Sequence, residues 1–486
     1  MFLSLRSVVC VTLLAGCAFA QGGSVWETKR SGWQTLPASD RARVEQFAAD
    51  YKAYIGGARS ALASTAEMIR QARAAGFAEF TAPAQVKPGA RLFVNNRDRS
   101  IALFIVGQEP ITAGLNIVGA HHDSPHIKLK ARPVIGRGGI ALFKTVYYGG
   151  IKEYQWANIP LALVGRISTS DGRNIDVSIG LKTGEPVFVI PDNAPHSDRP
   201  LRDRKYEEVL KGEELNPVAG SVPAEHGGVV GQVVQTLTAT YKIREEDLVG
   251  AELLLVPASQ PADVGVDRGL IGGYGQDDRL SAFCAVRALM EARAVPRFTA
   301  VAYLTNLEEA GSGNTTGART EAFFTVLARM IAAQNPRDGA DAGLRAALRN
   351  SVMISADAND GLNPIFGETT SEASNAARVG YGPTIKMYGG AFDPPPEVTA
   401  RMRGLLDRAG IPWQTQTPRV GVGGGGTIGG FFSVRDIDVI DFGVPLLSMH
   451  SPYEVSSKVD VWYFYRFMSE FFAWDRTTAG EQVEKR

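Results

Sequence analysis

Short apolar runs that alternate with helical patterns constrain the fold of this chain most strongly. The helical patterns cover residues 44–55, 61–75, 280–292 and 459–474. The runs that we expect to form buried strands are 92–95, 101–106, 115–119, 253–256, 298–305, 352–355 and 437–442. This alternation predicts an α/β fold, with an open, mostly parallel sheet and helices on both of its faces.

A segment with a different residue pattern interrupts this alternation. Between residues 134 and 250 the sequence has short apolar runs, glycines and a charged stretch over 198–214. We expect this segment to form an inserted β-rich domain. The main domain would then consist of residues 37–133 and 251–478 together. The chain has 486 residues, of which 44% are hydrophobic, so it is long enough to bury more than one core.

The amino terminus has the pattern of a targeting segment, with an apolar stretch over 8–15 that is too short to span a bilayer. Ala18-Phe-Ala20 suits ordinary secretory cleavage, which would remove a signal peptide of residues 1–20. Leu14-Ala-Gly-Cys17 resembles the bacterial lipobox, which would make residues 1–16 a lipoprotein signal and place an acyl group on Cys17. We favour the lipobox because all four of its positions match. Both processing routes predict an exported protein, either periplasmic or lipid-anchored to a bacterial membrane, or otherwise secreted.

Composition argues against several classes of partner. Lys plus Arg and Asp plus Glu both total 51, so we expect no overall field that would attract nucleic acid. No internal run approaches the roughly 20 apolar residues of a membrane span, so we expect membrane contact only through an anchor on Cys17. Cys10 and Cys17 belong to the targeting segment, which leaves Cys284 without a cysteine partner for an intrachain disulfide.

Histidines are rare in this chain and clustered. Three of the six lie close together, at His121, His122 and His126. His121 and Asp123 follow the predicted strand 115–119, and open α/β sheets place their ligand crevices at this end of a strand. A carboxylate there can orient an imidazole whose other nitrogen binds a cation. A loop that is rich in histidine by chance is the alternative.

Further ionisable side chains lie at the ends of other predicted elements. They are Asp277, Glu308, Glu309, Asp357 and His450. Each has an ordinary explanation by itself, such as a helix cap, a solvated turn or a core histidine. Together they would be too costly to bury without compensating charge. Imidazole and carboxylate ligands without thiolates predict a site for zinc, cobalt or manganese.

Several short motifs occur in a characteristic order. They are Gly119-Ala-His-His-Asp-Ser-Pro125, Tyr148-Gly-Gly150, Asn306-Leu-Glu-Glu-Ala-Gly-Ser312, Gly426-Thr-Ile-Gly429 and Met449-His-Ser451. This ordered set resembles the di-zinc aspartyl aminopeptidase family, which also contains vacuolar aminopeptidase I. The resemblance runs from about residue 46 to residue 472. His122 departs from the family pattern, in which threonine is usual, and His126 is at most a neighbour of the substrate.

The resemblance implies a role for each residue of the metal site. His121, Asp277 and Asp357 would bind one metal ion, and Asp277 would bridge to a second ion bound by Glu309 and His450. Asp123 would fix the tautomer of His121, and Glu308 would act as the general base. The cofactors implied are two divalent metal ions, with Zn²⁺ favoured and Co²⁺ or Mn²⁺ as alternatives. A cis peptide between Asp277 and Asp278 is also expected.

The resemblance further implies a metal-dependent aminopeptidase that acts on peptides, with 134–250 serving as a dimerisation or lid domain of a homo-oligomer, up to a dodecamer. His196, Lys386, Gly426 and Thr427 would contact the substrate, His196 from a neighbouring subunit. Asp360 stands where the family usually has histidine, which puts a preference for acidic residues in question. A broad or leucine-preferring aminopeptidase is one alternative. A catalytically silent member of the same fold, serving as a metal-binding or scaffold protein, is the other.

Overall fold

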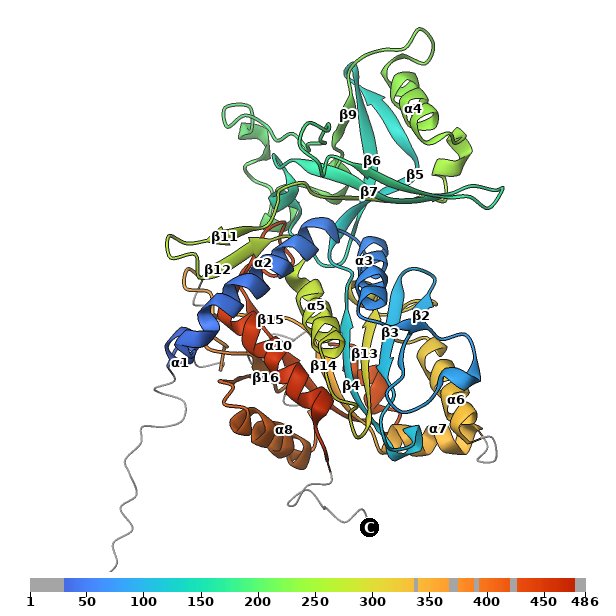
Figure 1. Ribbon diagram of the computed structural model, residues 1–486. Coiled ribbons are helices and arrows are strands. Elements are labelled where there is room, and N and C mark those ends of the chain that lie inside the picture. The colour runs from blue at the N-terminus through green and yellow to red at the C-terminus, as the bar shows by residue number, and fades with distance from the viewer. Residues whose placement is uncertain (1–29, 336–339, 367–374, 389–392, 420–425, 477–486) are drawn as a thin grey trace, which may run out of the picture.

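The computed structural model describes residues 30–335, 340–366, 375–388, 393–419 and 426–476. The chain forms a larger lobe, drawn at the bottom of Figure 1, and a smaller lobe above it. The predicted targeting segment with Cys17 lies outside the described residues. Within them, no helix combines the length and the apolar character that crossing a membrane requires.

A nine-stranded sheet forms the centre of the larger lobe. In spatial order its strands are β1 (Ala78–Glu79), β2 (Arg91–Asn96), β3 (Ser100–Ile105), β13 (Thr299–Thr305), β4 (Leu115–His121), β14 (Val352–Ala356), β18 (Asp438–Gly443), β16 (Thr384–Lys386) and β17 (Gln414–Gln416). The four central strands β13, β4, β14 and β18 run parallel to one another. Their carboxyl ends therefore meet at one edge of the sheet, which is where such sheets place their ligands.

Helices cover both faces of this sheet, as the alternation of patterns predicts. Residues of β4 alternate between two cores, with Val118 and Ala120 in one and Leu115 and Ile117 in the other. The first core is closed by α2 (Arg41–Gly57), α3 (Ala61–Ala74), α5 (Gln276–Met290), α8 (Pro396–Arg408) and α10 (Lys458–Ala473). The second is closed by α6 (Ala322–Gln334), α7 (Ala340–Arg349) and α9 (Gly429–Ser433). The predicted α/β class is thus confirmed.

The smaller lobe contains an antiparallel sheet of six strands (Figure 1). They are β8 (Asn174–Ile179), β7 (Leu161–Ser168), β10 (Glu252–Pro257), β5 (His126–Arg137), β6 (Ile140–Tyr148) and β9 (Val218–Gly220), and the helix α4 (Gly228–Tyr241) accompanies them. This sheet includes 126–133 and 252–257, which the sequence pattern assigned to the main domain. The apolar run 253–256 correctly predicts a buried strand, but it carries no information about which of two sheets that strand joins.

Two small sheets support the carboxyl edge of the large one. One consists of β11 (Ala262–Val264), β12 (Leu270–Gly273) and β20 (Glu454–Ser457), and the other of β15 (Asn359–Asp360) and β19 (Pro445–Leu446). β12 leads directly into α5, and β20 leads into α10. These connections fix where α5 begins, at the edge at which the ionisable residues gather.

Candidate active site

The carboxyl edge of the large sheet brings the predicted ionisable residues together. His121 is the last residue of β4, Asp357 follows β14, and Glu308 and Glu309 follow β13 after a short turn. Asp277 comes from the start of α5, where its backbone is not yet helical, and the peptide between Asp277 and Asp278 is cis, as expected. The parallel order of the central strands therefore explains why residues far apart in sequence meet here.

One half of the cluster is centred on His121. Its Nε2 lies 3.3 Å from Asp277 Oδ1 and 3.6 Å from Asp357 Oδ1. Asp278 also belongs to this half, because His121, Asp278 and Asp357 can present ligand atoms within 4.8 Å of one another. Sequence reasoning assigned Asp278 no role, since an acidic residue next to Asp277 at a helix start has an ordinary capping explanation.

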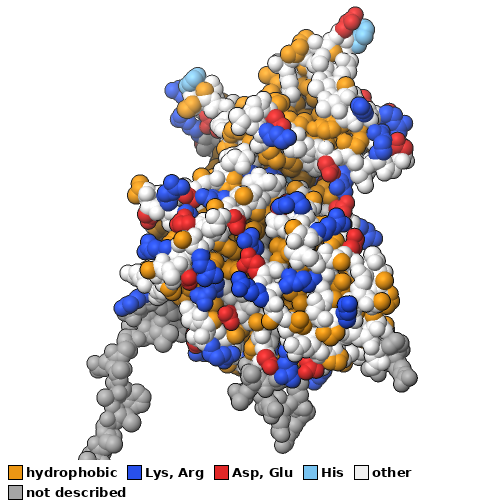
Figure 2. All heavy atoms as spheres, in the orientation of Figure 1, with side chains coloured by type: hydrophobic (Ala, Val, Ile, Leu, Met, Phe, Trp, Pro, Cys, Tyr) orange, Lys and Arg blue, Asp and Glu red, His pale blue; other side chains and the backbone are white. Residues whose placement is uncertain are grey.

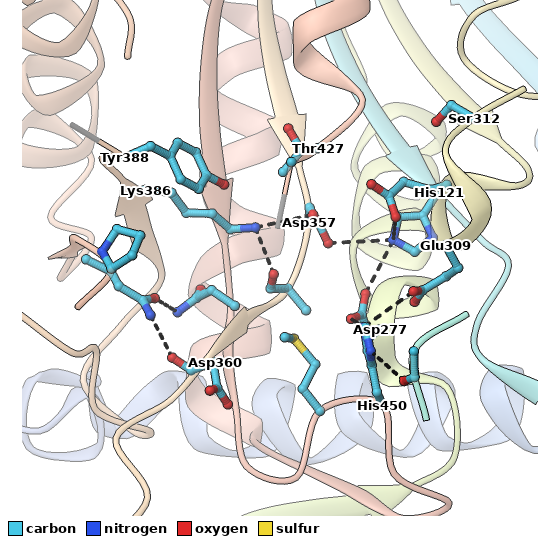
Figure 3. A pocket seen from close by; sticks show the side chains of 18 of the residues that line it. His121, Asp277, Glu309, Ser312, Asp357, Asp360, Lys386, Tyr388, Thr427 and His450 are labelled. Atoms are coloured by element: carbon cyan, nitrogen blue, oxygen red, sulfur yellow. Dashed lines mark hydrogen bonds and ion pairs between the residues drawn. The ribbon is translucent and has the colours of Figure 1, made fainter. Parts of the chain in front are cut away.

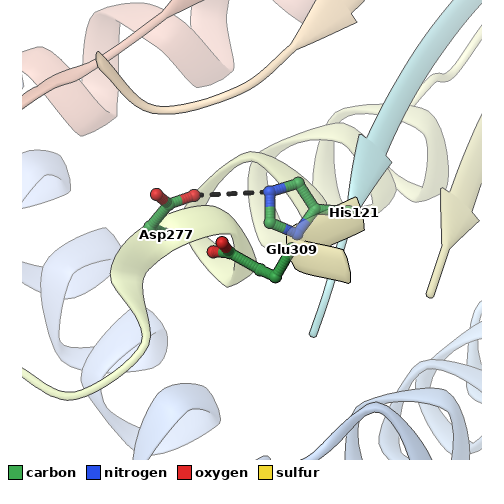
Figure 4. Close-up of side chains that lie close together, drawn as sticks. All are labelled: His121, Asp277 and Glu309. Atoms are coloured by element: carbon green, nitrogen blue, oxygen red, sulfur yellow. Dashed lines mark ion pairs between the residues drawn. The ribbon is translucent and has the colours of Figure 1, made fainter. Parts of the chain in front are cut away.

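The other half of the cluster is centred on His450. Its Nε2 lies 3.2 Å from Asp277 Oδ2 and 3.4 Å from Glu309 Oε2. Figure 4 shows the carboxylates of Asp277 and Glu309 converging beside the ring of His121. The two oxygens of Asp277 thus face two different histidines.

The chemistry of this cluster fits divalent cations. Asp277 Oδ1 and Glu309 Oε1 are buried and accept no hydrogen bond within the described structure. Burial lowers the pKa of His450, but Asp277 and Glu309 more than offset this effect and raise that pKa to about 10. Burial and the neighbouring Asp277 also raise the pKa of Glu309 well above its usual value. Buried carboxylates this close together are stabilised by a positive charge between them. The imidazole and carboxylate groups match the ligands of zinc sites.

Asp123 lies behind His121 and is held by several donors. His121 Nδ1 lies 3.1 Å from the backbone oxygen of Asp123 and 3.4 Å from its Oδ1. The backbone N–H groups of Glu308 and Glu309 donate to Asp123 at 3.2 and 3.3 Å, and the Tyr148 hydroxyl donates at 2.5 Å. Burial alone would raise the pKa of Asp123, but these partners, His121 foremost, lower it. Asp123 therefore stays ionised beside His121.

Glu308 lies at the opening of the cluster. Its Oε2 is 3.9 Å from His121 Nε2, and its side chain is 17% exposed. Burial raises the pKa of Glu308 to about 7, an effect that His121 opposes and Asp357 reinforces. A carboxyl group with this pKa can exchange protons near neutral pH.

A cavity of about 640 Å³ opens in front of these groups and contains most of the predicted substrate contacts (Figure 3). Lys386, Gly426 and Thr427 all line it. The Lys386 ammonium donates to the Ala358 backbone oxygen at 2.8 Å and lies 3.3 Å from Asp357 Oδ2. Lys386 therefore supports Asp357 as well as facing the cavity.

Other predicted or clustered residues lie elsewhere. His196 is exposed on the smaller lobe and does not line the cavity of its own chain. His122 is buried between the Ser64 hydroxyl at 3.0 Å and the Arg99 backbone oxygen at 2.8 Å, and burial lowers its pKa to about 4. His126 does not border the substrate cavity, because its ring stacks on Tyr148 in the smaller lobe.

Sequence reasoning missed Glu454, a buried carboxylate beneath the cluster. Its Oε1 accepts the backbone N–H of His450 at 2.9 Å. Its Oε2 accepts the N–H groups of Gln276 and Asp277 at 2.5 and 3.2 Å. Glu454 therefore fixes the two backbone segments that carry Asp277 and His450. No local signal marks it, because it is a single acidic residue in a short strand.

Comparison with known proteins identifies the family of this chain. The family description "Aminopeptidase I zinc metalloprotease (M18)" matches residues 54–472. A probable M18 family aminopeptidase 1 from Thermotoga maritima is 39% identical over 435 residues, which are 87% of this chain and 95% of that protein. The corresponding protein of Borrelia garinii is 35% identical over 455 residues, 91% of this chain and 99% of the relative.

Solved structures show the same relationship. The crystal structure of an M18-family aminopeptidase from Thermotoga maritima has a TM-score of 0.85 at 37% identity and covers 92% of this chain and 99% of its own. That of aminopeptidase I from Borrelia burgdorferi has a TM-score of 0.79 at 31% identity, covering 92% and 100%. The chain therefore belongs to the M18 family of aminopeptidase I zinc metalloproteases and is a metal-dependent aminopeptidase.

Proposed function

We propose that this aminopeptidase releases the amino-terminal residue of peptides at a centre of two divalent metal ions that share Asp277. The observation that carries the proposal is the position of Asp277, whose Oδ1 lies 3.3 Å from His121 Nε2 and whose Oδ2 lies 3.2 Å from His450 Nε2. Asp357 would complete the first ligand set and Glu309 the second. Two cations bound there would acidify a water molecule and polarise the scissile carbonyl.

In this mechanism Glu308 moves the proton. Its carboxylate would accept a proton from the attacking water and deliver it to the nitrogen of the leaving amine. Asp123 would keep the Nδ1 side of His121 occupied, so that Nε2 faces the metal site. The free amino group of the substrate would lie at the Glu309 and His450 side, which restricts cleavage to the first residue.

For the substrate side chain, we infer a broad preference rather than a strict acidic one. Lys386 already interacts with Asp357 and Ala358. An acidic side chain would therefore rely on Arg419, the second of the two Lys or Arg side chains among the described residues that line the cavity, and would meet the carboxylate of Asp360. Cleavage rates for peptides that differ only in their first residue test this inference. A large advantage for Asp and Glu would contradict it.

A dodecamer is the form of a yeast mApe1 structure, which shares the fold at 21% identity and a TM-score of 0.73. In this chain α4 has half-exposed valines (Val229, Val230, Val233 and Val234), and hydrophobic side chains are visible on this lobe in Figure 2. We propose that the chain forms a homo-oligomer through this lobe. We also propose that the protein is exported, with an amino-terminal signal that is removed or with an acyl group on Cys17. Light scattering and mass spectrometry of the mature chain test both proposals.

The Glu308→Gln variant tests the catalytic assignment. We expect the rate of peptide hydrolysis to fall by about 10²–10⁴-fold, the usual contribution of a general base. Two metal ions per chain should remain bound, because Glu308 is not one of the proposed ligands. Glu321→Gln, a change in an exposed glutamate paired with Arg435, is the matched control. Unchanged activity of Glu308→Gln at full metal content would contradict the role of Glu308.

A further inference from the structure

The end of strand β6 brings the smaller lobe into contact with the metal site. Tyr148 is the last residue of β6, and Gly149 and Gly150 follow it. These three residues form the Tyr-Gly-Gly motif, to which the proposed mechanism gives no role. Each of them lies against a different part of the site, although the residues that would bind metal all belong to the larger lobe.

Tyr148 reaches the site through its hydroxyl. This group donates to Asp123 Oδ2 at 2.5 Å, while the other oxygen of Asp123 lies 3.4 Å from His121 Nδ1. Burial and the nearby Asp123 raise the pKa of Tyr148 well above its usual value, so the phenol keeps the proton that it donates. The ring is held by stacking on His126, with the centroids 4.4 Å apart and the planes 16° from parallel. Tyr148 is therefore a rigid donor to the carboxylate behind His121.

Gly149 allows the chain to pass close to the site. Its φ of +74° is a conformation that favours glycine. A Cβ at this position would lie 3.1 Å from Pro125 Cγ and 3.3 Å from the Cβ of Glu309. A larger residue would therefore press on Glu309 as well as straining the backbone.

Gly150 contacts the second histidine. Its backbone oxygen lies 2.9 Å from His450 Nδ1, so it accepts a hydrogen bond when that nitrogen carries the proton. The Nε2 atom of the ring then faces Asp277 and Glu309. A hydrogen bond on the far nitrogen of a ligating histidine commonly fixes both its tautomer and its orientation.

We propose that Tyr148, Gly149 and Gly150 form a positioning segment, through which the smaller lobe holds both histidines of the metal site in their ligating orientation. Tyr148 acts on His121 through Asp123, and Gly150 acts on His450 directly. Gly150 also lines the cavity, but the segment offers no side chain to the metal ions, so its residues are positioning residues. This proposal rests on the proposed two-metal function and adds that the geometry of the centre depends on the smaller lobe.

The Tyr148→Phe variant of the full chain tests the proposal, because it removes one hydroxyl and keeps the stacked ring. Its matched control is Tyr147→Phe, since Tyr147 is 47% exposed and alternate residues of a strand point to opposite faces. Metal-free protein is titrated with Co²⁺ alone, followed by calorimetry and by visible absorption. We expect Tyr148→Phe to weaken Co²⁺ binding by about 10–100-fold and to change the absorption spectrum, whereas Tyr147→Phe stays within about twofold of wild type.

Kinetics and a second variant complete the test. With saturating metal, Tyr148→Phe should lower kcat while KM changes little, and Gly149→Ala should weaken Co²⁺ binding at least as strongly. If Tyr148→Phe and Tyr147→Phe bind Co²⁺ with the same affinity and spectrum, the positioning role is wrong, although the aminopeptidase function stands. A wild-type chain that binds no pair of Co²⁺ ions would instead overturn the proposed function, and this proposal with it.

Discussion

The two lobes contribute to the site in different ways. The larger lobe supplies the side chains with ligating chemistry, because its parallel strands end at one edge. The smaller lobe is an antiparallel sheet, and it reaches the site through one tyrosine hydroxyl and one backbone oxygen. On the proposed assignment the larger lobe supplies the ligands, and both lobes orient them.

Removal of divalent cations should have the largest effect. All the proposed ligands lie in the larger lobe, so chelation should reduce peptide hydrolysis to background. The circular dichroism spectrum of the chain should be unchanged, because both sheets persist. Zn²⁺, Co²⁺ or Mn²⁺ should restore activity, measured together with metal content. Full activity in protein shown to be free of metal would contradict the claim that the larger lobe supplies ligands for catalytic metal ions.

Glu454→Gln should have the next largest effect. In the wild type, the backbone N–H groups of Asp277 and His450 each donate to an oxygen of Glu454. Glutamine would replace one of these oxygens with an NH₂ group, which cannot accept a hydrogen bond, so the segments of Asp277 and His450 should shift. We expect metal affinity to fall by about 10–100-fold. The control is Asp460→Asn, since Asp460 is also buried and accepts the N–H groups of Gly380 and Gly382. Equal losses of affinity in both variants would show a general effect on folding rather than positioning.

Asp460 itself should affect stability rather than activity. Burial raises its pKa to about 7 from an ordinary value of 3.8, an effect that the N–H groups of Gly380 and Gly382 oppose. Between about pH 4 and pH 7 the folded chain therefore keeps a proton that the unfolded chain has lost, so this group lowers stability as pH rises through that interval. In Asp460→Asn this contribution is absent, and Tm should fall less between pH 5 and pH 8 than in wild type. Parallel Tm curves would contradict the assignment.

Removal of an ion pair between the lobes should have the smallest effect on stability and activity. Arg99 of the larger lobe pairs with Glu252 of β10 at 2.5 Å, and both side chains are about a quarter exposed. Glu252→Gln should lower the free energy of unfolding by about 0.2–1 kcal/mol and leave kcat/KM unchanged. Denaturant titration and peptide kinetics measure these quantities. A loss of activity as large as that expected for Tyr148→Phe would indicate that any contact between the lobes, rather than this segment, controls the site.

The sequence predicted site residues best where an ionisable side chain lies at the end of an apolar strand. The strands that end near His121 and Asp357 are short, mostly apolar runs, with His121 as the last residue of β4 and Asp357 directly after β14. The resemblance then paired these residues with Asp277 and His450. The same reasoning placed 253–256 in the main domain, because apolar periodicity identifies a buried strand and not its neighbours.

Supporting residues were harder to predict. Glu454 acts on backbone N–H groups. The pairing of β12 with β20 brings Asp277 to it, whereas His450 lies four residues earlier in the same segment. Tyr148 acts across the boundary between two sheets. Neither role leaves a recognisable pattern, since the contacts of Glu454 with Asp277 and of Tyr148 with Asp123 form only in the folded chain. His196 remains a prediction that only an oligomeric structure can test.

The central claim is that Asp277 is shared between two metal ions. A crystal structure of the zinc-loaded protein, with anomalous scattering recorded on both sides of the zinc edge, tests it most directly. The account predicts two zinc peaks that flank the Asp277 carboxylate, one beside His121 and Asp357 and the other beside Glu309 and His450. A single peak in the cluster, or zinc bound without contact to Asp277, would contradict it.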